Sequence, residues 1–409
     1  MLEVAHREQV GSISEWLAVR DLNRLGVDVI PTGWSLSSVG DACDIRNELR
    51  LPIAVEDRAQ MDGRFPYYGP TGVLGHINEY RAEGEFALIG EDGDHFLDPS
   101  NKPQTVRVSG RFNVNNHAHL VAGTDKCDVE WFAYFYRNRD IFHSLTRQGA
   151  NRFKLTKASL ERLPILLPPL SEQRRIAEIL RTWDEAIEKL EALRAAKERL
   201  SEAVQLRLFE AEYEAQKNLK RAKEIFEPVS ERGRTDLPLL AVMQDIGIVR
   251  RDVLERRVVM PEGDTSSYKV VRPGDFVISL RSFEGGLEHS QISGLVSPAY
   301  TVLRPTHSTV DEYFSTYFKS RSFVGRLDKL IFGIRDGKQI AFRDFGDMLI
   351  PAPPIATQRR AAEILSALGE DIKIETRRIA ALHRQKRGLM QKLLTGEWRV
   401  SEISEGANG

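Results

Sequence analysis

The sequence contains an internal repeat, and this feature constrains the fold more than any other. Residues 168–180 match residues 353–365 at nine of thirteen positions, at an offset of 185 residues. Each copy begins with Pro-Pro and contains Gln-Arg-Arg-x-Ala-Glu-Ile-Leu. Weaker likenesses upstream of both segments extend the repeat backward. The repeat therefore predicts two copies of one domain of roughly 130 to 150 residues, each followed by the same helix start.

A long helix is predicted after each copy. Ser171 is a candidate N-cap, and no Gly or Pro interrupts the chain from there to Pro228. Apolar residues then recur at alternating steps of three and four, which is coiled-coil spacing. The first predicted seam is Ile176, Ile179, Trp183, Ala186, Leu190, Leu193, Lys197, Leu200 and Val204. The second is Leu365, Leu368, Ile372, Glu375, Ile379, Leu382, Lys386, Leu389 and Leu393.

Neither seam can stay exposed to water, so we expect the two helices to pack on each other. The alternative is that each seam packs on its own domain. Short apolar runs between Gly and Pro predict strands inside both copies, with one helix in each, at 129–144 and 312–326. The aromatic residues of these two helices are expected to lie in the core rather than to form a base-stacking platform.

These patterns predict an α+β chain with two repeated mixed α/β domains separated by two long antiparallel coiled-coil helices. The expected boundaries are an N-terminal helical extension at 1–24, a first domain at 25–168, a first spacer helix at 169–227, a second domain at 228–353, a second spacer helix at 354–396 and a tail at 397–409.

Composition excludes several classes of protein. The 58 Lys and Arg residues nearly balance the 59 Asp and Glu residues, so total charge neither indicates nor excludes nucleic acid. No apolar stretch reaches the roughly 18 residues of a spanning helix, and the start lacks a secretion signal, so a cytoplasmic protein is expected. Cys43 and Cys127 are too few for a disulfide scaffold or a four-ligand zinc site and are expected to be reduced and partly buried.

Two basic windows recur in the two copies. Residues 137–162 and residues 319–343 each hold seven basic and two acidic residues. A basic stretch that runs from a helix into a Gly-containing loop suits phosphate contact, and Arg, Asn and Gln can hydrogen-bond base edges. A solvated charged face is the alternative for either window alone, but the recurrence favours nucleic acid. The candidate DNA contacts are Arg147, Gln148, Asn151, Arg152, Lys154, Arg335, Lys338, Gln339 and Arg343.

The sequence contains no convincing catalytic constellation. Asp336 and Lys338 could form half of a metal-dependent nuclease site, but no acidic partner is distinguishable. His117 and His119 would share one strand face, yet no nearby Cys or paired carboxylates suggest a metal site. We therefore expect neither catalytic residues nor a bound metal in this chain.

The chain resembles the DNA-specificity subunit of type I restriction-modification systems, from about Pro31 to Gly396. Its segment Pro-Leu-Ser-Glu-Gln-Arg-Arg-Ile-Ala is highly characteristic of that family, and Phe-Pro-Tyr-Tyr-Gly at 65–69 and Ser-Pro-Ala-Tyr at 297–300 look like parts of the family's target-recognition domains. The resemblance implies that each domain reads one half of a bipartite DNA target. It also implies that the paired helices act as a spacer. The extension at 1–24 departs from the family pattern, and the resemblance assigns it no role.

The resemblance further implies partners and cofactors outside this chain. Two methyltransferase subunits would dock on the helices to methylate adenine at N6, and two restriction subunits would add ATP-dependent cleavage. S-adenosylmethionine, ATP and magnesium are thus expected in the partners and none of them in this chain, which would not be an enzyme on its own. Tyr68 and Arg281 are further candidate DNA contacts. The candidate spacer or partner-binding residues are Gln173, Arg174, Arg175, Ile176, Ile179, Trp183, Gln358, Arg359, Arg360, Leu365, Leu368 and Ile372. A cryptic nuclease and a coiled-coil adaptor that binds no DNA remain as alternatives.

Overall fold

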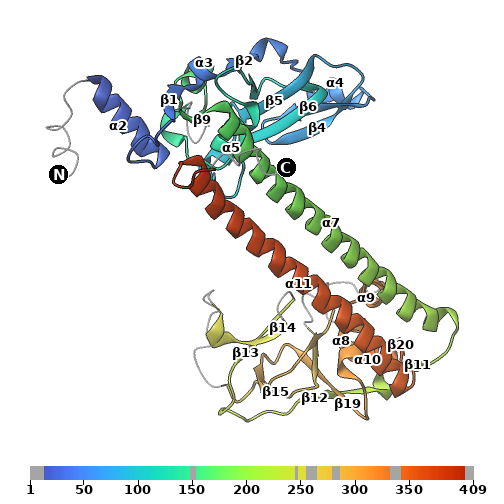
Figure 1. Ribbon diagram of the computed structural model, residues 1–409. Coiled ribbons are helices and arrows are strands. Elements are labelled where there is room, and N and C mark those ends of the chain that lie inside the picture. The colour runs from blue at the N-terminus through green and yellow to red at the C-terminus, as the bar shows by residue number, and fades with distance from the viewer. Residues whose placement is uncertain are drawn as a thin grey trace, which may run out of the picture. The chain divides into compact units, whose positions relative to one another are not determined.

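The computed structural model describes residues 13–147, 153–244, 247–254, 265–278, 286–331 and 342–400. The chain divides into two compact units, unit 1 with the residues up to Lys189 and from Ala380 onward, and unit 2 with Leu190–Ile379. Two long helices belong to both units. Helix α7 (Leu170–Glu214, 45 residues) begins in unit 1 and ends in unit 2, and α11 (Ile355–Leu394, 40 residues) does the reverse (Figure 1). In the part of the chain that is described, no helix is both long and apolar enough to cross a membrane.

A six-stranded sheet forms the centre of unit 1. Its strand order is β2-β7-β5-β6-β3-β4, and all neighbours are antiparallel except β3 and β6. The bounds are Asp44–Ile45 (β2), Phe65–Gly69 (β3), Gly72–Ile77 (β4), Ala82–Gly90 (β5), Thr105–Val114 (β6) and Ala118–Ala122 (β7). The end of β5 is buried on both faces, because Ala87 and Ile89 join one core cluster whereas Phe86 and Leu88 join another.

Smaller elements complete unit 1. The helices are α2 (Ile13–Leu25), α3 (Val39–Ala42), α4 (Val55–Ala59), α5 (Val129–Tyr136) and α6 (Lys157–Glu161), with 3₁₀ turns at Asn47–Leu49, Asp94–Leu97 and Phe142–Ser144. Two further strand pairs are β1 (Ser35–Ser38) with β10 (Pro164–Leu167), and β8 (Thr146–Arg147) with β9 (Phe153–Lys154). Cys43 and Cys127 are free, and both are buried, more deeply than the partial burial that was predicted.

Helix α5 supplies the aromatic core of unit 1. Asp128 caps it, because its carboxylate accepts hydrogen bonds from the amides of Glu130 (2.9 Å) and Trp131 (3.3 Å). Residues 131–136 are all buried. The indole of Trp131 donates to Leu166 O at 2.9 Å, and the Tyr136 hydroxyl donates to Pro164 O at 2.7 Å. The aromatic residues are therefore core, as predicted, although the helix ends at Tyr136 rather than at 144.

Unit 2 is built from smaller sheets. Its largest has the order β12-β19-β16-β17, with bounds Phe226–Val229 (β12), Phe276–Ile278 (β16), Glu288–His289 (β17) and Thr301–Pro305 (β19). The two-stranded pairs are β11 (Leu219–Arg221) with β20 (Leu349–Pro351), β13 (Leu240–Met243) with β14 (Gly247–Arg250), and β15 (Lys269–Val271) with β18 (Gly294–Val296). Short 3₁₀ turns lie at Ala222–Glu224 and Arg251–Val253. The helices are α8 (Asp311–Lys319), α9 (Arg321–Ile331) and α10 (Phe342–Asp347).

The single helix predicted at 312–326 is two helices. Ser320 separates them, because its backbone is extended and its amide caps α8 through Tyr317 O. Its hydroxyl also accepts a hydrogen bond from the amide of Phe323 at 3.2 Å, which satisfies an otherwise unpaired donor at the start of α9. The aromatic cluster around Phe226, which contacts Phe314 and Phe318 edge to face or tilted, fills the core as expected.

The first long helix ends earlier than predicted. It stops at Glu214 instead of continuing to 227, although no Gly or Pro breaks it. Gln216 and Asn218 instead take positive φ values of 49° and 54°, and the Asn218 amide donates to the Glu212 carboxylate at 2.9 Å. Asn tolerates this left-handed conformation better than most residues, so the chain turns there and enters β11.

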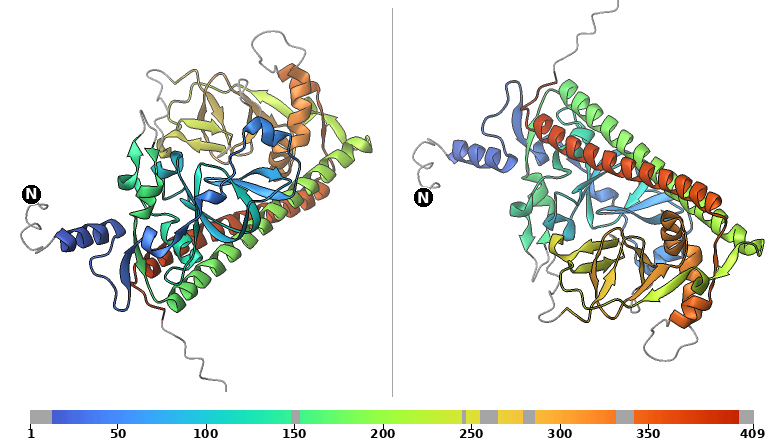
Figure 2. Two further views of the ribbon diagram at one scale, coloured as in Figure 1. Left: turned by 90° about the horizontal axis from the view of Figure 1, so that it is seen from above. Right: turned by 90° about the horizontal axis from the view of Figure 1, so that it is seen from below.

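The two long helices pack on each other inside each unit, in opposite directions. In unit 1 the start of α7 and the end of α11 share a core cluster that includes Ile176, Leu180, Met390 and Leu393. In unit 2 the end of α7 and the start of α11 share another, which includes Phe209, Ala361 and Leu365. Figure 2 shows the two helices side by side. The antiparallel coiled coil is therefore confirmed.

The predicted seam of α11 is confirmed, but that of α7 is half wrong. On α11 the nine seam positions are all buried or half-buried. On α7 Trp183, Leu190, Lys197 and Val204 are half-buried, whereas Leu193 and Leu200 are 43% and 53% exposed. In place of positions 179, 186, 193 and 200, the row of residues one position later, at 180, 187, 194 and 201, is buried or half-buried. This row is apolar only at Leu180 and Ile187, because positions 194 and 201 are Arg and Ser, so apolar spacing alone favoured the exposed Leu193 and Leu200.

Candidate nucleic-acid interface

Two predicted DNA contacts of the first domain, Arg147 and Lys154, lie on the paired strands β8 and β9. Thr146 pairs with Lys154 and Arg147 with Phe153, so the hairpin presents Arg147 and Lys154 on neighbouring strands. Several predicted contacts lie outside the described residues, namely Gln148, Asn151, Arg152, Arg281, Arg335, Lys338 and Gln339, as does Asp336 of the nuclease alternative. Arg147, Lys154, Tyr68 and Arg343 lie within them.

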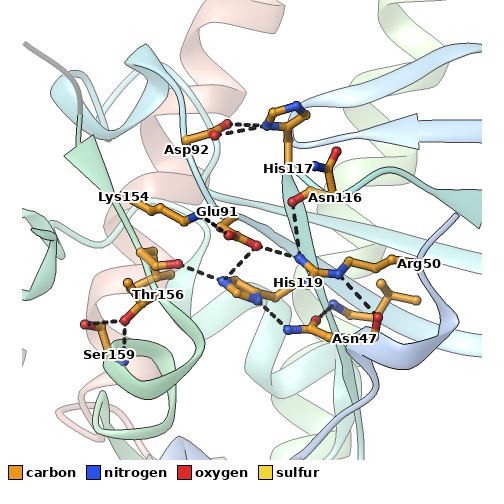
Figure 3. A network of polar contacts seen from close by, with 12 residues as sticks. Asn47, Arg50, Glu91, Asp92, Asn116, His117, His119, Lys154, Thr156 and Ser159 are labelled. Atoms are coloured by element: carbon orange, nitrogen blue, oxygen red, sulfur yellow. Dashed lines mark hydrogen bonds and ion pairs between the residues drawn. The ribbon is translucent and has the colours of Figure 1, made fainter. Parts of the chain in front are cut away.

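Lys154 is held by a carboxylate. Its ammonium group lies 2.7 Å from Glu91 Oε1, and the guanidinium of Arg50 lies 2.5 Å from Glu91 Oε2 (Figure 3). Glu91 directly follows β5, and its side chain is only 12% exposed. Burial alone would raise the pKa of Glu91, but the hydrogen bonds from Lys154 and Arg50 outweigh it and lower the pKa. Glu91 is therefore a carboxylate shared by two cations.

His119 belongs to the same network through both of its ring nitrogens. Its Nε2 lies 2.7 Å from the carbonyl oxygen of Leu155, so Nε2 carries the proton. Its Nδ1 accepts from the side-chain amide of Asn47 at 2.8 Å, and the Asn47 oxygen accepts from the amide of Leu120, which fixes the orientation of Asn47. Burial lowers the pKa of His119, so the ring is neutral near pH 7.

His117 makes a different contact on the same edge of the sheet. Its Nδ1 lies 3.0 Å from both carboxylate oxygens of Asp92 (Figure 3). The side chain of His117 is exposed, whereas that of His119 is buried. The two histidines thus have separate environments. Among the described residues, no group of three or more His, Cys, Asp or Glu side chains is placed to hold a metal ion.

Tyr68 is connected to this edge by the backbone. It lies on β3, and its carbonyl accepts from the amide of Asn115 at 3.0 Å. The Asn115 side chain in turn accepts from the amide of His117 at 2.9 Å. The ring of Tyr68 is half-buried at 5.8 Å from that of Phe112, and burial raises its pKa. The structure thus brings Tyr68, Arg147 and Lys154 to one region of unit 1, whereas Arg343 is exposed on α10 of unit 2.

The basic windows are less available for DNA than their charge suggests. In the first, Arg137 pairs with Asp184 at 3.3 Å, and Arg139 donates to Leu25 O at 2.9 Å. Burial lowers the pKa of Arg139 to about 10. In the second, Lys319 pairs with Glu288 and Arg326 with Glu210. These partners are distant in sequence, so the spacing of charges could not show that these cations stabilise the fold.

Two glutamines of the repeat attach the long helices to the starts of α5 and α8. The Gln173 side chain accepts from the amide of Asp128 at 2.8 Å and donates to Lys126 O and Pro168 O. The Gln358 side chain accepts from the amide of Val310 at 3.1 Å and donates to Pro353 O at 2.8 Å. Asp128 and Val310 are the N-caps of α5 and α8. Both glutamines are buried, so they belong to the attachment of the spacer and not to an exposed partner surface.

The other predicted spacer residues divide by exposure. Ile176 and Leu365 are buried, and Ile179, Trp183, Leu368 and Ile372 are half-buried. Arg174, Arg359 and Arg360 are exposed, and Arg175 is half-buried. The arginines that follow each glutamine are thus surface residues at equivalent places in both copies. Their recurrence was the signal in the sequence, but it did not separate the buried glutamine from the exposed arginines.

Comparisons with known proteins agree with this architecture. A family model described as the type I restriction modification DNA specificity domain matches residues 31–197. A putative type I restriction enzyme specificity subunit of Haemophilus influenzae is 36% identical over 140 residues, which cover 34% of each chain. The putative type I restriction enzyme MjaX specificity subunit of Methanocaldococcus jannaschii is 24% identical over 96% of both chains. The crystal structure of the type I restriction-modification S subunit from M. genitalium covers 88% of this chain and 96% of its own, with a TM-score of 0.55 and 14% identity, and so shares the fold.

Two mixed α/β units, each leading through Pro-Pro into one of two antiparallel helices, define a class of two-domain specificity proteins. Residues 31–197 match the DNA specificity domain of type I restriction-modification systems, and nearly the whole chain is similar to specificity subunits of these systems. These similarities indicate a role in DNA specificity. None of the matches reported above is a nuclease or a coiled-coil adaptor, so the two alternative interpretations gain no support.

Proposed function

We propose that each of the two repeated domains reads one half of a bipartite DNA target and so directs where adenine is methylated at N6. The observation that carries this proposal is the repeated attachment, because Gln173 and Gln358 each accept from a helix N-cap amide and donate to a proline carbonyl, and so connect the two recognition domains to the long helices in the same way. Two separate readers held on one coiled coil favour a split target over a continuous one. Binding of duplexes with either half-site altered, by the chain assembled with its methyltransferase subunits, tests the proposal.

The methyltransferase subunits would bind the exposed faces of the long helices. Arg174, Arg359 and Arg360 are exposed there, and so are Leu193 and Leu200 of α7. Exposed leucines on a long helix beside charged residues are typical of a protein interface. Two methyltransferase subunits would complete a methylating complex, and two restriction subunits would add ATP-dependent cleavage. Co-purification of the methyltransferase subunit with wild-type chain and with an Arg359→Ala/Arg360→Ala variant tests this contact.

The catalytic cofactors would belong to these partners. S-adenosylmethionine would be held by the methyltransferase subunits, and ATP and magnesium by the restriction subunits, in the cytoplasm. The chain alone would then neither methylate nor cleave DNA. Methyl transfer or cleavage by the purified chain above a mock preparation would contradict this assignment.

A further inference from the structure

Glu91 connects three segments of unit 1 that are distant in sequence. Its carboxylate contacts Lys154 on β9 and Arg50, which follows the turn at 47–49. Its backbone adds two more links, because its amide donates to His117 O at 2.8 Å and its carbonyl accepts from the amide of Leu155 at 2.8 Å. One residue at the end of a buried central strand thus holds the sheet edge and the β8–β9 hairpin together.

Both backbone groups of Leu155, the residue after Lys154, are hydrogen-bonded to the sheet edge. The amide of Leu155 donates to Glu91 O, and its carbonyl accepts from the neutral imidazole of His119 at 2.7 Å. Leu155 itself is fully buried in the core of unit 1. The base of the hairpin is therefore fixed, and the position of the Lys154 side chain follows from that of Glu91.

Arg50 is fixed in the same way. Besides Glu91, its guanidinium donates to Asn116 O at 3.2 Å and to Asn47 O at 3.3 Å. Its three acceptors belong to three segments, so it ties the turn at 47–49 to the sheet edge that carries His117. Without a carboxylate at position 91, Arg50 and Lys154 would be two neighbouring cations with no shared partner.

We propose that Glu91 is a positioning residue for DNA reading by the first domain, because it holds Lys154 and Arg50 and thereby fixes the β8–β9 hairpin on the sheet. The inference rests on the proposed function of that domain. Base contacts discriminate only when the reading side chains are held closely in place by the residues behind them. In this arrangement Lys154 supports the hairpin through Glu91 instead of neutralising a phosphate.

The first test is Glu91→Gln, which keeps the shape of the side chain and removes its charge. The chain assembled with its methyltransferase subunits is titrated with three duplexes, namely the intact target and the targets with the first or the second half-site altered. We expect discrimination at one half-site to fall about tenfold while discrimination at the other is unchanged. Glu83→Gln is the matched control, since it makes the same change at an exposed ion pair with Arg111 in the same domain and should leave both ratios unchanged.

The second test is Lys154→Met, alone and combined with Glu91→Gln, which also covers the case that Glu91→Gln fails to fold. If Lys154 acts through Glu91, Lys154→Met alone lowers discrimination at the same half-site. The double variant then discriminates no less than the single variant with the lower discrimination. The salt dependence of binding is unchanged. A salt slope lowered by about 0.9 with discrimination retained would show that Lys154 contacts phosphate and would overturn the inference. Retained discrimination in a folded Glu91→Gln complex would also overturn it. Equal binding of all three duplexes by the wild-type complex would instead contradict the proposed function itself.

Discussion

Lys386 of α11 pairs with Asp184 of α7 inside unit 1, and the lysine side chain is only 6% exposed. The same carboxylate accepts from the Tyr134 hydroxyl at 2.9 Å and pairs with Arg137. Within unit 2 the other seam lysine, Lys197, lies 2.8 Å from Asp371 and 3.0 Å from Glu375. Each polar position of the predicted seams thus has a partner on the opposite helix. Paired polar residues in a seam specify its register, so these contacts favour one antiparallel alignment.

This arrangement predicts an asymmetry between the two partners in unit 1. Asp184→Ala leaves Lys386 buried without a counter-ion and should lower the free energy of unfolding by about 2–4 kcal/mol. Lys386→Met fills the same space and leaves Asp184 bonded to Tyr134, so it should cost about 1 kcal/mol or less. Chemical denaturation measures both, with Lys373→Met at an exposed pair with Glu370 as the control. A larger cost for Lys386→Met than for Asp184→Ala would refute this account of the seam.

Loss of a repeat glutamine should loosen the attachment of a long helix. Gln173→Leu removes three hydrogen bonds and leaves the amide of Asp128 without its acceptor. We expect the free energy of unfolding to fall by about 2–4 kcal/mol and hydrogen exchange to become faster at the start of α5. Lys189→Ala, at an exposed position further along α7, is the control and should change neither. Unchanged exchange at Asp128 in the Gln173→Leu variant would argue against the attachment.

The buried histidines predict that unit 1 loses stability in mild acid. Burial lowers the pKa values of His119 and His95 below the ordinary 6.5, although Glu91 opposes the shift at His119 while Arg50 and Lys154 reinforce it. The unfolded chain then binds these protons first, so the stabilisation is complete above about pH 6.5 and is lost as pH falls through the lower folded-state values. Glu91, whose pKa is also lowered, adds a further loss below about pH 4.5. A free energy of unfolding that stays constant from about pH 7 to 5 would be inconsistent with this prediction.

The two readers should respond separately to changes in their basic loops. Arg152→Ala and Arg335→Ala should each weaken binding of the assembled complex by about 1–3 kcal/mol if the side chain reads a base, and by less with a smaller salt slope if it contacts phosphate. Each variant should affect only its own half-site. Competition binding with half-site duplexes measures this, and simultaneous loss at both halves would argue against two independent readers.

The repeat and the helical periodicity were enough to predict the duplicated domains, the paired helices and the aromatic cores. Other features depended on contacts between distant residues. The partner helix α11 decides which residues of α7 face it, because Ile179 and Leu180 both fit the coiled-coil spacing. Ser320 and Asn218 end helices through local hydrogen bonds at positions without Gly or Pro.

Charge gave the least reliable prediction of the site. Lys154 and Arg139 lie in one basic window, but Glu91 binds the first and backbone carbonyls bind the second. Neither partner lies where charge spacing along the window could show it. The buried role of Gln173 was likewise hidden, because a recurrent Gln-Arg-Arg does not say which of its residues faces the core.

Mapping of methylated adenines tests whether this chain supplies DNA specificity through two half-site readers. Genomic DNA is sequenced from cells that contain the methyltransferase subunit with this chain, without it, or with a chain whose second recognition domain is exchanged for that of a relative. We expect N6-methyladenine in a two-part motif only when the chain is present, and a change in one part alone after the exchange. Identical methylation with and without the chain, or a change in both parts after the exchange, would contradict it.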